Sequence, residues 1–323
     1  MEGTPAMKRQ LGGVLRLTRF QEYTSFVTVT TLLGAAVAHG SFGWPLIRVL
    51  AANWLAVGFA FMINDVEDAP DDALSPAKAG RNPVSAGDLS ARLGRAASII
   101  EAAFAAALYA WLGLWPFAIG ATCLGIGYLY SWRRVRLKTV PVADLVSHAL
   151  MLAGLQFLAA YFTFGRSPAW QWVFPFTSVV AISLYGQLFN ELRDFDGDLK
   201  AGVTHTASRV GPRVAHFLMM TWLGIGIASA IVTVFVIRLI PAWVLLVMLA
   251  LTGVLLLRPL LKARRFRSAV ELQQPFQKPV EVAAAVSLAA WFGGSWVLST
   301  LDWEIMLTVQ RWMIFLSRIG KGL

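Results

Sequence analysis

The chain has 323 residues, of which 57% are apolar and only 14% are charged. A soluble globular domain has roughly 45–50% apolar and about 25% charged residues, so this composition excludes a soluble protein and indicates an integral membrane protein. The formal net charge of +10 does not indicate nucleic-acid binding, because no basic run is interleaved with surface aromatic residues.

Apolar segments long enough to cross a bilayer follow one another along the chain. A spanning helix needs about 20 residues, and the sequence predicts an all-α integral membrane protein with nine transmembrane helices. They cover residues 20–41, 46–63, 93–111, 112–130, 141–162, 170–189, 214–236, 239–259 and 281–300. The spans form one domain, 20–300, preceded by an N-terminal segment, 1–19, that has no cleavable signal pattern.

Basic residues predict the orientation of these spans, because cytoplasmic loops accumulate Lys and Arg. With the N-terminus in the cytoplasm, the inside segments hold 22 of the 28 basic residues. We therefore expect a cytoplasmic N-terminus in a bacterial or archaeal cytoplasmic membrane. The C-terminal segment, 301–323, is amphipathic and basic; we expect an interfacial helix there, with a tenth span as the alternative.

An acidic string follows the second span. Residues 63–72, INDVEDAPDD, hold five carboxylates, whose mutual repulsion must be offset by solvent, a cation or function. A second string, NELRDFDGD at 190–198, follows the sixth span and aligns with residues 64–72 after a shift of 126. The alignment pairs Asn64 with Asn190, Asp65 with Glu191, Asp68 with Asp194 and Asp72 with Asp198. It predicts two pseudo-repeated bundles around a central cavity, with both strings on the cytoplasmic side.

The spacing within each string predicts a metal site. Positions i, i+3 and i+7 share one stripe of a helix, so Asp65, Asp68 and Asp72 form one stripe and Glu191, Asp194 and Asp198 another. Pro70 and Gly197 are expected to unwind the last turn at most. Facing carboxylates suit Mg²⁺, which binds one or two carboxylates per ion plus substrate phosphates. A solvated acidic loop would explain one string but not two in register, and DFDGD lacks the twelfth-position Glu of an EF-hand.

Two cytoplasmic segments supply cations. Residues 75–90 carry Lys78 and Arg81, which we expect beside the first string, and residues 128–141 carry Arg136 and Lys138 just before the fifth span. Arg133 and Arg134 are equally well explained by the inside bias of basic residues. Carboxylates for metal, cations for phosphate and an apolar interior together predict a prenyl diphosphate substrate. Tyr128, Tyr130 and Tyr185 are candidates to face a carbocation, although each also fits an interfacial or packing role.

These motifs resemble the UbiA superfamily of intramembrane prenyltransferases, over residues 11 to 300. The first motif, Asn-Asp-x-x-Asp-x-x-x-Asp, is met at 64–72, and the second, Asp-x-x-Asp-x-x-x-Asp, is met except that Glu191 replaces its first Asp. YSWRRVRLKTVPVADL, 130–145, is similar to the family's Tyr-Ser-…-Arg-Leu-Lys-…-Pro-…-Asp segment. RNPVSAG is similar to its Arg-Pro-…-Gly stretch with Asn82 inserted, and LRLTRF to its Thr-Arg-Pro with Phe20 in place of proline.

The resemblance implies a Mg²⁺-dependent enzyme that binds an isoprenyl diphosphate and a small-molecule acceptor within the bilayer. It implies catalytic roles for Asp65, Asp68, Asp194, Arg136 and Lys138. The further substrate contacts predicted are Asn64, Lys78, Arg81, the three tyrosines, Asn190 and Arg19. The oligomeric state is left open.

The acceptor is also open. An aromatic or quinone-precursor ring is expected from the frequency of such acceptors in the family, with a non-aromatic acceptor, such as a glycerol phosphate lipid or a carotenoid, and terpene cyclisation as alternatives. A divalent-cation transporter is the non-enzymatic alternative, but it would need carboxylates near the bilayer midplane instead of at span ends. A CDP-alcohol phosphotransferase is excluded because its Asp-Gly-x-x-Ala-Arg spacing is absent.

Overall fold

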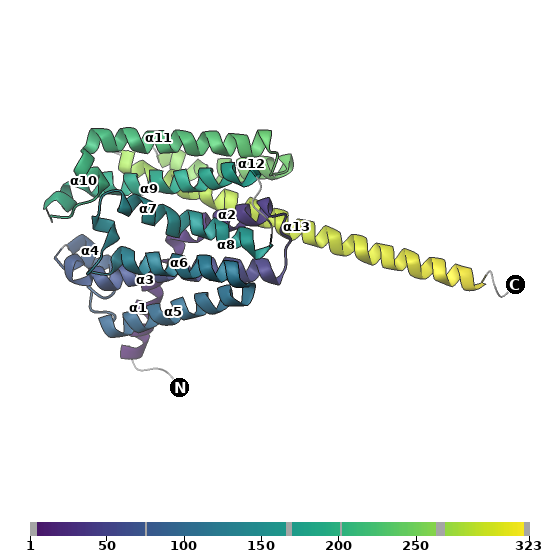
Figure 1. Cartoon of the computed structure of the whole chain (residues 1–323), viewed down its shortest axis with the longest axis horizontal. Helices are drawn as coiled ribbons and strands as arrows, with labels where there is room; N and C mark the ends of the chain where they lie inside the picture. The colour runs from purple at the N-terminus through teal and green to yellow at the C-terminus, as the bar shows by residue number, and fades with distance from the viewer. Residues whose placement is uncertain (1–4, 75, 166–169, 201, 263–268, 320–323) are drawn as a thin grey trace.

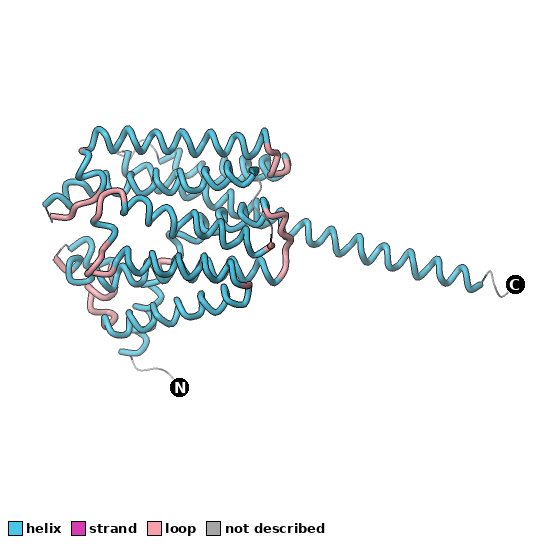
Figure 2. The backbone as a smooth tube through the Cα atoms, in the orientation of Figure 1, coloured by secondary structure: helices cyan, strands magenta, loops and turns pink. Residues whose placement is uncertain are grey.

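The computed structural model describes residues 5–74, 76–165, 170–200, 202–262 and 269–319, and every regular element in this part of the chain is helical (Figures 1 and 2). The all-α prediction is therefore confirmed. The α-helices are α1 (Pro5–Thr18), α2 (Phe20–Val37), α3 (Trp44–Asp72), α4 (Pro76–Arg81), α5 (Ala91–Leu112), α6 (Leu114–Ser131), α7 (Ala143–Ala149), α8 (Leu155–Thr163), α9 (Val173–Lys200), α10 (Thr206–Val210), α11 (Pro212–Ile231), α12 (Ala242–Lys262) and α13 (Ala269–Ile319).

Short irregular helical turns join or extend some of these helices. A π-helical turn, Leu150–Gly154, connects α7 to α8, so that the three together form one segment over Ala143–Thr163. A second π-helical turn, Val232–Val236, extends α11. Two 3₁₀ turns, Leu137–Thr139 and Trp170–Trp172, precede α7 and α9.

Within the described residues, seven helical segments are long and apolar enough to cross a membrane, in agreement with an integral membrane protein. They are Trp44–Asp72, Ala91–Leu112, Ala143–Thr163, Trp170–Leu199, Pro212–Val236, Ala242–Lys262 and Pro275–Thr300. The other two predicted spans, 20–41 and 112–130, correspond to α2 and α6, which have 18 residues each. The first turn of α2 is polar, with Gln21 and Glu22. Nine crossings and two repeated bundles stay predictions.

The long helices run side by side along one axis of the molecule (Figure 1). Helix α9 packs against α11, and α3 packs against α5. Helix α1 lies across the bundle axis near the end that holds α4 and α10, whereas α13 continues beyond the opposite end (Figure 1). The predicted C-terminal segment thus begins inside α13; the side chains of 301–319 and all of 320–323 lie outside the described residues.

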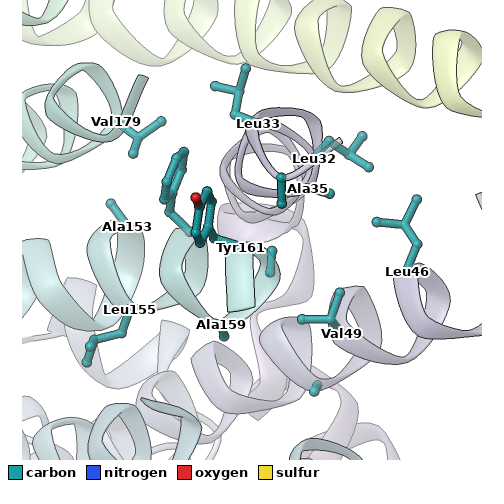
Figure 3. Packing of buried hydrophobic residues seen from close by; sticks show 14 of the residues in the cluster. Leu32, Leu33, Ala35, Leu46, Val49, Ala153, Leu155, Ala159, Tyr161 and Val179 are labelled. Carbon is teal, nitrogen blue, oxygen red and sulfur yellow. The ribbon is translucent and has the colours of Figure 1, made fainter. Parts of the chain in front are cut away.

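The largest apolar core lies between α2, α3, α8 and α9. Figure 3 shows Leu33 of α2, Leu46 of α3, Tyr161 of α8 and Val179 of α9 converging in this core. Small residues let the helices approach closely, as is typical of helix packing in membranes. A Cβ atom at Gly34 would lie only 2.4 Å from the backbone oxygen of Phe157, so no larger residue fits there without separating α2 from α8.

A buried polar network ties α3 to its neighbours. The Asn53 side chain, which is fully buried, donates to Thr31 Oγ1 (2.7 Å) and to the Gln156 backbone oxygen (3.0 Å), and it accepts from the Tyr109 hydroxyl (2.6 Å). Polar groups in an apolar interior are costly unless they are hydrogen-bonded. The network therefore fixes the rotation of α3, and with it the direction of the acidic stripe at the end of this helix.

Candidate functional site

Both acidic strings lie at the same end of the bundle. Helix α3 continues to Asp72 through Pro70, and α9 continues to Lys200 through Gly197, so the last turns do not unwind as the sequence suggested. The Nζ atom of Lys78, in α4 after the first string, lies 3.7 Å from Asp198 Oδ1 in the second string. Lys78 therefore reaches the second string and links the two.

Side chains from neighbouring loops stabilise the end of α3. The last carbonyl groups of a helix have no partner within the helix, and proline removes one further donor. Loop side chains donate to three backbone oxygens in the last turns of α3: Asn82 Nδ2 to Asp65 O (2.7 Å), Arg133 Nε to Glu67 O (2.9 Å) and Ser85 Oγ to Ala69 O (2.8 Å), which also accepts from the Ala73 backbone nitrogen (3.1 Å). These contacts hold the end of α3 against the neighbouring loops on both sides of Pro70.

Arg19 contacts the first carboxylate of the stripe. It stands between α1 and α2 in a left-handed backbone conformation, with a φ of 47°. Its Nη1 atom donates to Asp65 Oδ1 (3.2 Å), while Nε and Nη2 bind the Glu22 carboxylate. Arg81 also donates to Glu22 (3.0 Å). Arg81 thus faces Glu22 of α2, not a carboxylate of either stripe.

Asp68 is held between two cations. Lys138 Nζ lies 2.5 Å from Asp68 Oδ2 and 2.8 Å from Asn64 Oδ1, and Arg136 Nη2 donates to Asp68 Oδ1 (3.1 Å) and to Asp71 Oδ2 (2.7 Å). Burial lowers the pKa of Lys138, and Asp68 offsets that effect only in part. Burial acts in the same direction on Arg136, but hydrogen bonds and charge from Asp71 and Asp68 outweigh it and raise the pKa. The arrangement concentrates positive charge on one carboxylate of the stripe.

Glu191, the residue that departs from the family motif, is buried and fully engaged. Its side chain is 5% exposed. Oε1 accepts from Gln187 Nε2 (3.0 Å), and Oε2 accepts from the backbone nitrogen of Ala207 (2.9 Å). Gln187 also lies 3.4 Å from the Tyr130 hydroxyl. The longer side chain of Glu191 therefore joins α9 to α10, and its partner Gln187 links α9 to α6.

His205 lies between two carboxylates of the second stripe. Its Nδ1 atom is 3.3 Å from Glu191 Oε2, and its Nε2 atom is 3.5 Å from Asp198 Oδ2. Burial lowers the pKa of His205, but hydrogen bonds and charge from Asp198 and Glu191 outweigh it and raise the pKa to about 9. When the ring is neutral, Nδ1 accepts from the Ser208 backbone nitrogen (3.2 Å) and caps α10.

Asp194, the remaining carboxylate of the second stripe, is more exposed than Glu191 and Asp198. Its two oxygens pair with the adjacent Arg193 (3.0 and 2.9 Å), and its side chain is 40% exposed. Asn190 is half-buried on the same helix. On the first string, Asp72 Oδ2 accepts from Asn82 Nδ2 (2.9 Å). Each stripe carboxylate therefore has a donor from the protein within reach.

The three candidate tyrosines are not equivalent. Tyr130 is half-buried and lies beside Gln187, with its ring 6.5 Å from the ring of His148. Tyr185 packs into the cluster of α9 and α11 residues. Tyr128 stacks on Trp132 and is 38% exposed. Among the three, Tyr130 is linked most directly to the acidic strings.

Asp144 holds the Lys138 loop against α10. This fully buried carboxylate accepts from the backbone nitrogen and the hydroxyl of Thr206, both at 2.5 Å. Thr204 Oγ1 donates to the Thr139 backbone oxygen (2.9 Å). The loop that carries Lys138, which contacts the first string, is thereby joined to the segment 204–206, whose His205 contacts the second string.

Sequence reasoning did not assign roles to Asn82, Asp144 or His205. The sequence presents Asn82 only as an insertion in RNPVSAG, and Asp144 only as the closing Asp of the segment similar to the family's Tyr-Ser-…-Arg-Leu-Lys-…-Pro-…-Asp pattern. A signal for His205 was present, because THTAS places a polar residue three positions before Ser208, as in a capping box. Its contact with both Glu191 and Asp198 depends on the tertiary fold, since 203–205 is an irregular connection.

Comparison with known proteins identifies the chain. The model of the UbiA prenyltransferase family matches residues 27–278. The chain belongs to the UbiA prenyltransferase family. This family consists of prenyltransferases, and the membrane-spanning helices place the chemistry of this member in a membrane.

Solved UbiA homologues share the fold. One from Archaeoglobus fulgidus, bound to GPP and Mg²⁺, is 21% identical, with a TM-score of 0.60 over 86% of this chain and 98% of that chain. The apo structure of a UbiA homolog from Aeropyrum pernix K1 is 18% identical, with a TM-score of 0.64 and the same coverage. A structure described for digeranylgeranylglyceryl phosphate synthase is 14% identical, with a TM-score of 0.59. The search of curated proteins gave no match.

The donor set of the acidic strings fits Mg²⁺. Within the described part of the chain, no group of three or more His, Cys, Asp or Glu side chains is close enough to hold a metal ion by itself. Mg²⁺ does not need such a group, because it is usually bound by one or two carboxylates with water and substrate phosphates completing its shell. Carboxylates at the ends of α3 and α9 can supply these one or two oxygen ligands on either side of a diphosphate.

Proposed function

We propose that this protein transfers a prenyl chain from a prenyl diphosphate to a small-molecule acceptor at the end of the bundle where the two acidic strings lie. The observation that carries this proposal is the placement of Lys138 and Arg136 on Asp68, with Lys78 reaching from the same face to Asp198. Two rows of carboxylates interleaved with cations suit a diphosphate bound together with metal ions. The family's homologue structures with GPP and Mg²⁺ and with DMAPP and Mg²⁺ support the same substrate class.

The cations of the site would act on the leaving group. During transfer, the C–O bond between the prenyl C1 and the diphosphate breaks, and the electron pair leaves with the diphosphate. Lys138 and Arg136 stabilise the charge that develops on that oxygen, and preorganised charges of this kind are among the largest contributions to catalysis. Lys138 is only 14% exposed, so its charge is poorly screened by water.

Asp65, Asp68 and Asp72 on α3 and Asp194 and Asp198 on α9 are the residues that would hold Mg²⁺, with Glu191 as a buried support. Bound Mg²⁺ supplies neutralisation of the diphosphate charge. Tyr130 is the proposed aromatic contact of the allylic cation; its half-burial and the approach of its hydroxyl to Gln187 (3.4 Å), which also binds Glu191, support this role. The acceptor then forms a bond to the prenyl C1 and loses a proton.

For the acceptor, we propose an aromatic or quinone-precursor ring as the first class to test, on the basis of family frequency. A glycerol phosphate lipid is the second class, since a structure described for a digeranylgeranylglyceryl phosphate synthase has a similar fold.

The test is a prenyl-transfer assay on membranes that contain the full chain, with radiolabelled geranylgeranyl diphosphate and both acceptor classes. We expect EDTA to stop product formation, Mg²⁺ to restore it, and Asp68→Asn or Asp194→Asn to lower turnover at least about 100-fold. Asp196→Asn is the matched control, because Asp196 is exposed in the second string but lies off its stripe. Retained turnover in Asp68→Asn would refute the proposed site. Release of cyclic hydrocarbon without any acceptor would replace transfer by terpene cyclisation.

A further inference from the structure

Apart from the region of the acidic strings, the bundle has a second candidate site. It is a cavity at the opposite end of the bundle, called the second cavity. Its volume is 920 Å³, which is within the range of about 300–1,000 Å³ typical of ligand sites. It is bounded by the end of α2 with residues 39–42, by Tyr161 of α8, by the connection 237–239 between α11 and α12, and by α13. No acidic residue is present among the described residues that line it.

Aromatic rings and one arginine give this cavity an amphipathic character. Trp291, Phe292 and Trp296 of α13 form an apolar wall, and the rings of Trp291 and Phe292 are 5.3 Å apart. Arg238 stands at the rim, exposed, and it makes no ion pair or hydrogen bond with any residue that the structure describes. An exposed guanidinium that has no carboxylate partner among the described residues is well suited to bind phosphate.

Beside the cavity lies a buried acceptor atom without a donor, on a residue that lines the cavity. The Oε1 atom of Gln171 is buried and has no hydrogen-bond partner among the described residues. A buried acceptor without a partner is destabilising, and such groups in native structures call for an explanation. A ligand hydroxyl in the cavity would donate to this oxygen once the Gln171 side chain rotates toward the cavity.

Backbone conformation marks the same place. Among the described residues, five that are not glycine have a left-handed φ, and of these Arg19 and Arg136 contact the first acidic string. His39 (φ 53°) and Arg238 (φ 54°) both line the second cavity. Left-handed conformations of such residues are costly and cluster at functional sites. The second cavity therefore shares this feature with the catalytic end.

We propose that this cavity binds one phospholipid from the leaflet opposite the acidic strings. The lipid phosphate pairs with Arg238, a headgroup hydroxyl donates to Gln171 Oε1, and an acyl chain lies against the aromatic wall. An anionic lipid with a hydroxylated headgroup, such as phosphatidylglycerol, satisfies all three features. The choline headgroup of a zwitterionic lipid lacks the hydroxyl and carries a cation beside Arg238. The site is separate from the prenyl diphosphate site, since the acidic strings lie at the other end of the bundle.

The test is native mass spectrometry of the full chain, released from nanodiscs that contain equal amounts of phosphatidylglycerol and phosphatidylcholine. We expect one retained phosphatidylglycerol, preferred over phosphatidylcholine by about tenfold, and loss of that preference in Arg238→Gln. Arg48→Gln is the matched control. Arg48 follows the N-terminus of α3 at the same end of the bundle, but its guanidinium lies over the Trp111 ring at 3.9 Å, so its removal leaves the lipid preference unchanged.

Three results would overturn the proposal. The first is equal retention of both lipids by the unaltered chain, and the second is an unchanged preference in Arg238→Gln. The third is displacement of the lipid by millimolar inorganic phosphate, which would show that a free anion and not a lipid is the ligand. Prenyl transfer in Arg238→Gln is the folding control, because Arg238 lies outside the catalytic site; we expect it to stay within about twofold of the unaltered enzyme.

Discussion

Replacing Glu191 by Asp restores the usual first residue of the family's second motif, yet we expect it to damage this protein. Asp is shorter by one methylene group. The carboxylate of Glu191 reaches Ala207 N at 2.9 Å and Gln187 Nε2 at 3.0 Å, distances that leave no slack for a retreat of about 1.5 Å, the length of one C–C bond. Both hydrogen bonds break in Glu191→Asp.

The loss of stability in Glu191→Asp can be estimated from these hydrogen bonds. Ala207 is fully buried, so its N–H loses its acceptor where water does not replace it, and an unsatisfied buried donor costs about 1–3 kcal/mol. We expect the free energy of unfolding to fall by about 2 kcal/mol, with the weakening centred on α10. Glu191→Gln, which keeps the length of the side chain and one acceptor oxygen, is expected to lose less.

The chain offers a direct assay for this loss. Cys123 is the only cysteine and is buried, so a thiol-reactive fluorogenic dye reports unfolding through a single site. We expect the melting temperature in detergent to fall in the order unaltered chain, Glu191→Gln, Glu191→Asp. A Glu191→Asp enzyme that is as stable as the unaltered chain and at least as active would refute the reasoning, because Glu191 would then act as an ordinary motif carboxylate.

Three further predictions concern other contacts. Lys138→Met removes a cation from Asp68 and from the leaving diphosphate, so we expect kcat to fall about 10²–10³-fold in the prenyl-transfer assay, with partial recovery in Lys138→Arg; a change below threefold would contradict this role. Asn82→Ala deletes the donor shared by Asp72 and the Asp65 carbonyl and is expected to cost about 1–2 kcal/mol, measured by the same thiol-dye melting; unchanged melting would show that the end of α3 does not depend on this cap. Tyr109→Phe leaves Asn53 Oδ1 without its donor and is expected to lower stability by about 1–3 kcal/mol with the Mg²⁺ requirement unchanged; a shifted Mg²⁺ requirement would mean that the network acts on the site directly.

Much of the fold follows from sequence because membrane helices are strongly constrained. Backbone N–H and C=O groups in lipid must form hydrogen bonds within their own segment, so long apolar runs predict helices directly. The predicted spans coincide with helices in the structure. Helix ends are less predictable. The sequence suggested that Pro70 and Gly197 unwind at most the last turn of each string, but both helices continue, and side chains of Asn82, Arg133 and Ser85 donate to backbone oxygens at the end of α3. These donors belong to loops whose position relative to the helix end cannot be predicted from the local sequence.

The site was predictable in its residue types more than in its pairings. Spacing places Asp65, Asp68 and Asp72 on one stripe, and the family resemblance adds Arg136 and Lys138, which do lie on Asp68. Spacing gives no information on Lys78, which was expected beside the first string and lies on Asp198. Contacts of that kind depend on how the two halves of the bundle meet, and this is set by tertiary packing.

The pairing of the stripe carboxylates with the protein's own donors affects how substrate is admitted. Asp65 is held by Arg19, Asp68 by Lys138 and Arg136, and Asp198 by Lys78. In the proposed site, these carboxylates would become ligands of the metal, and the arginines and lysines that they release would bind the phosphate oxygens. Binding therefore requires a ligand that supplies a metal cation for the carboxylates and an anion for the arginines and lysines at the same time.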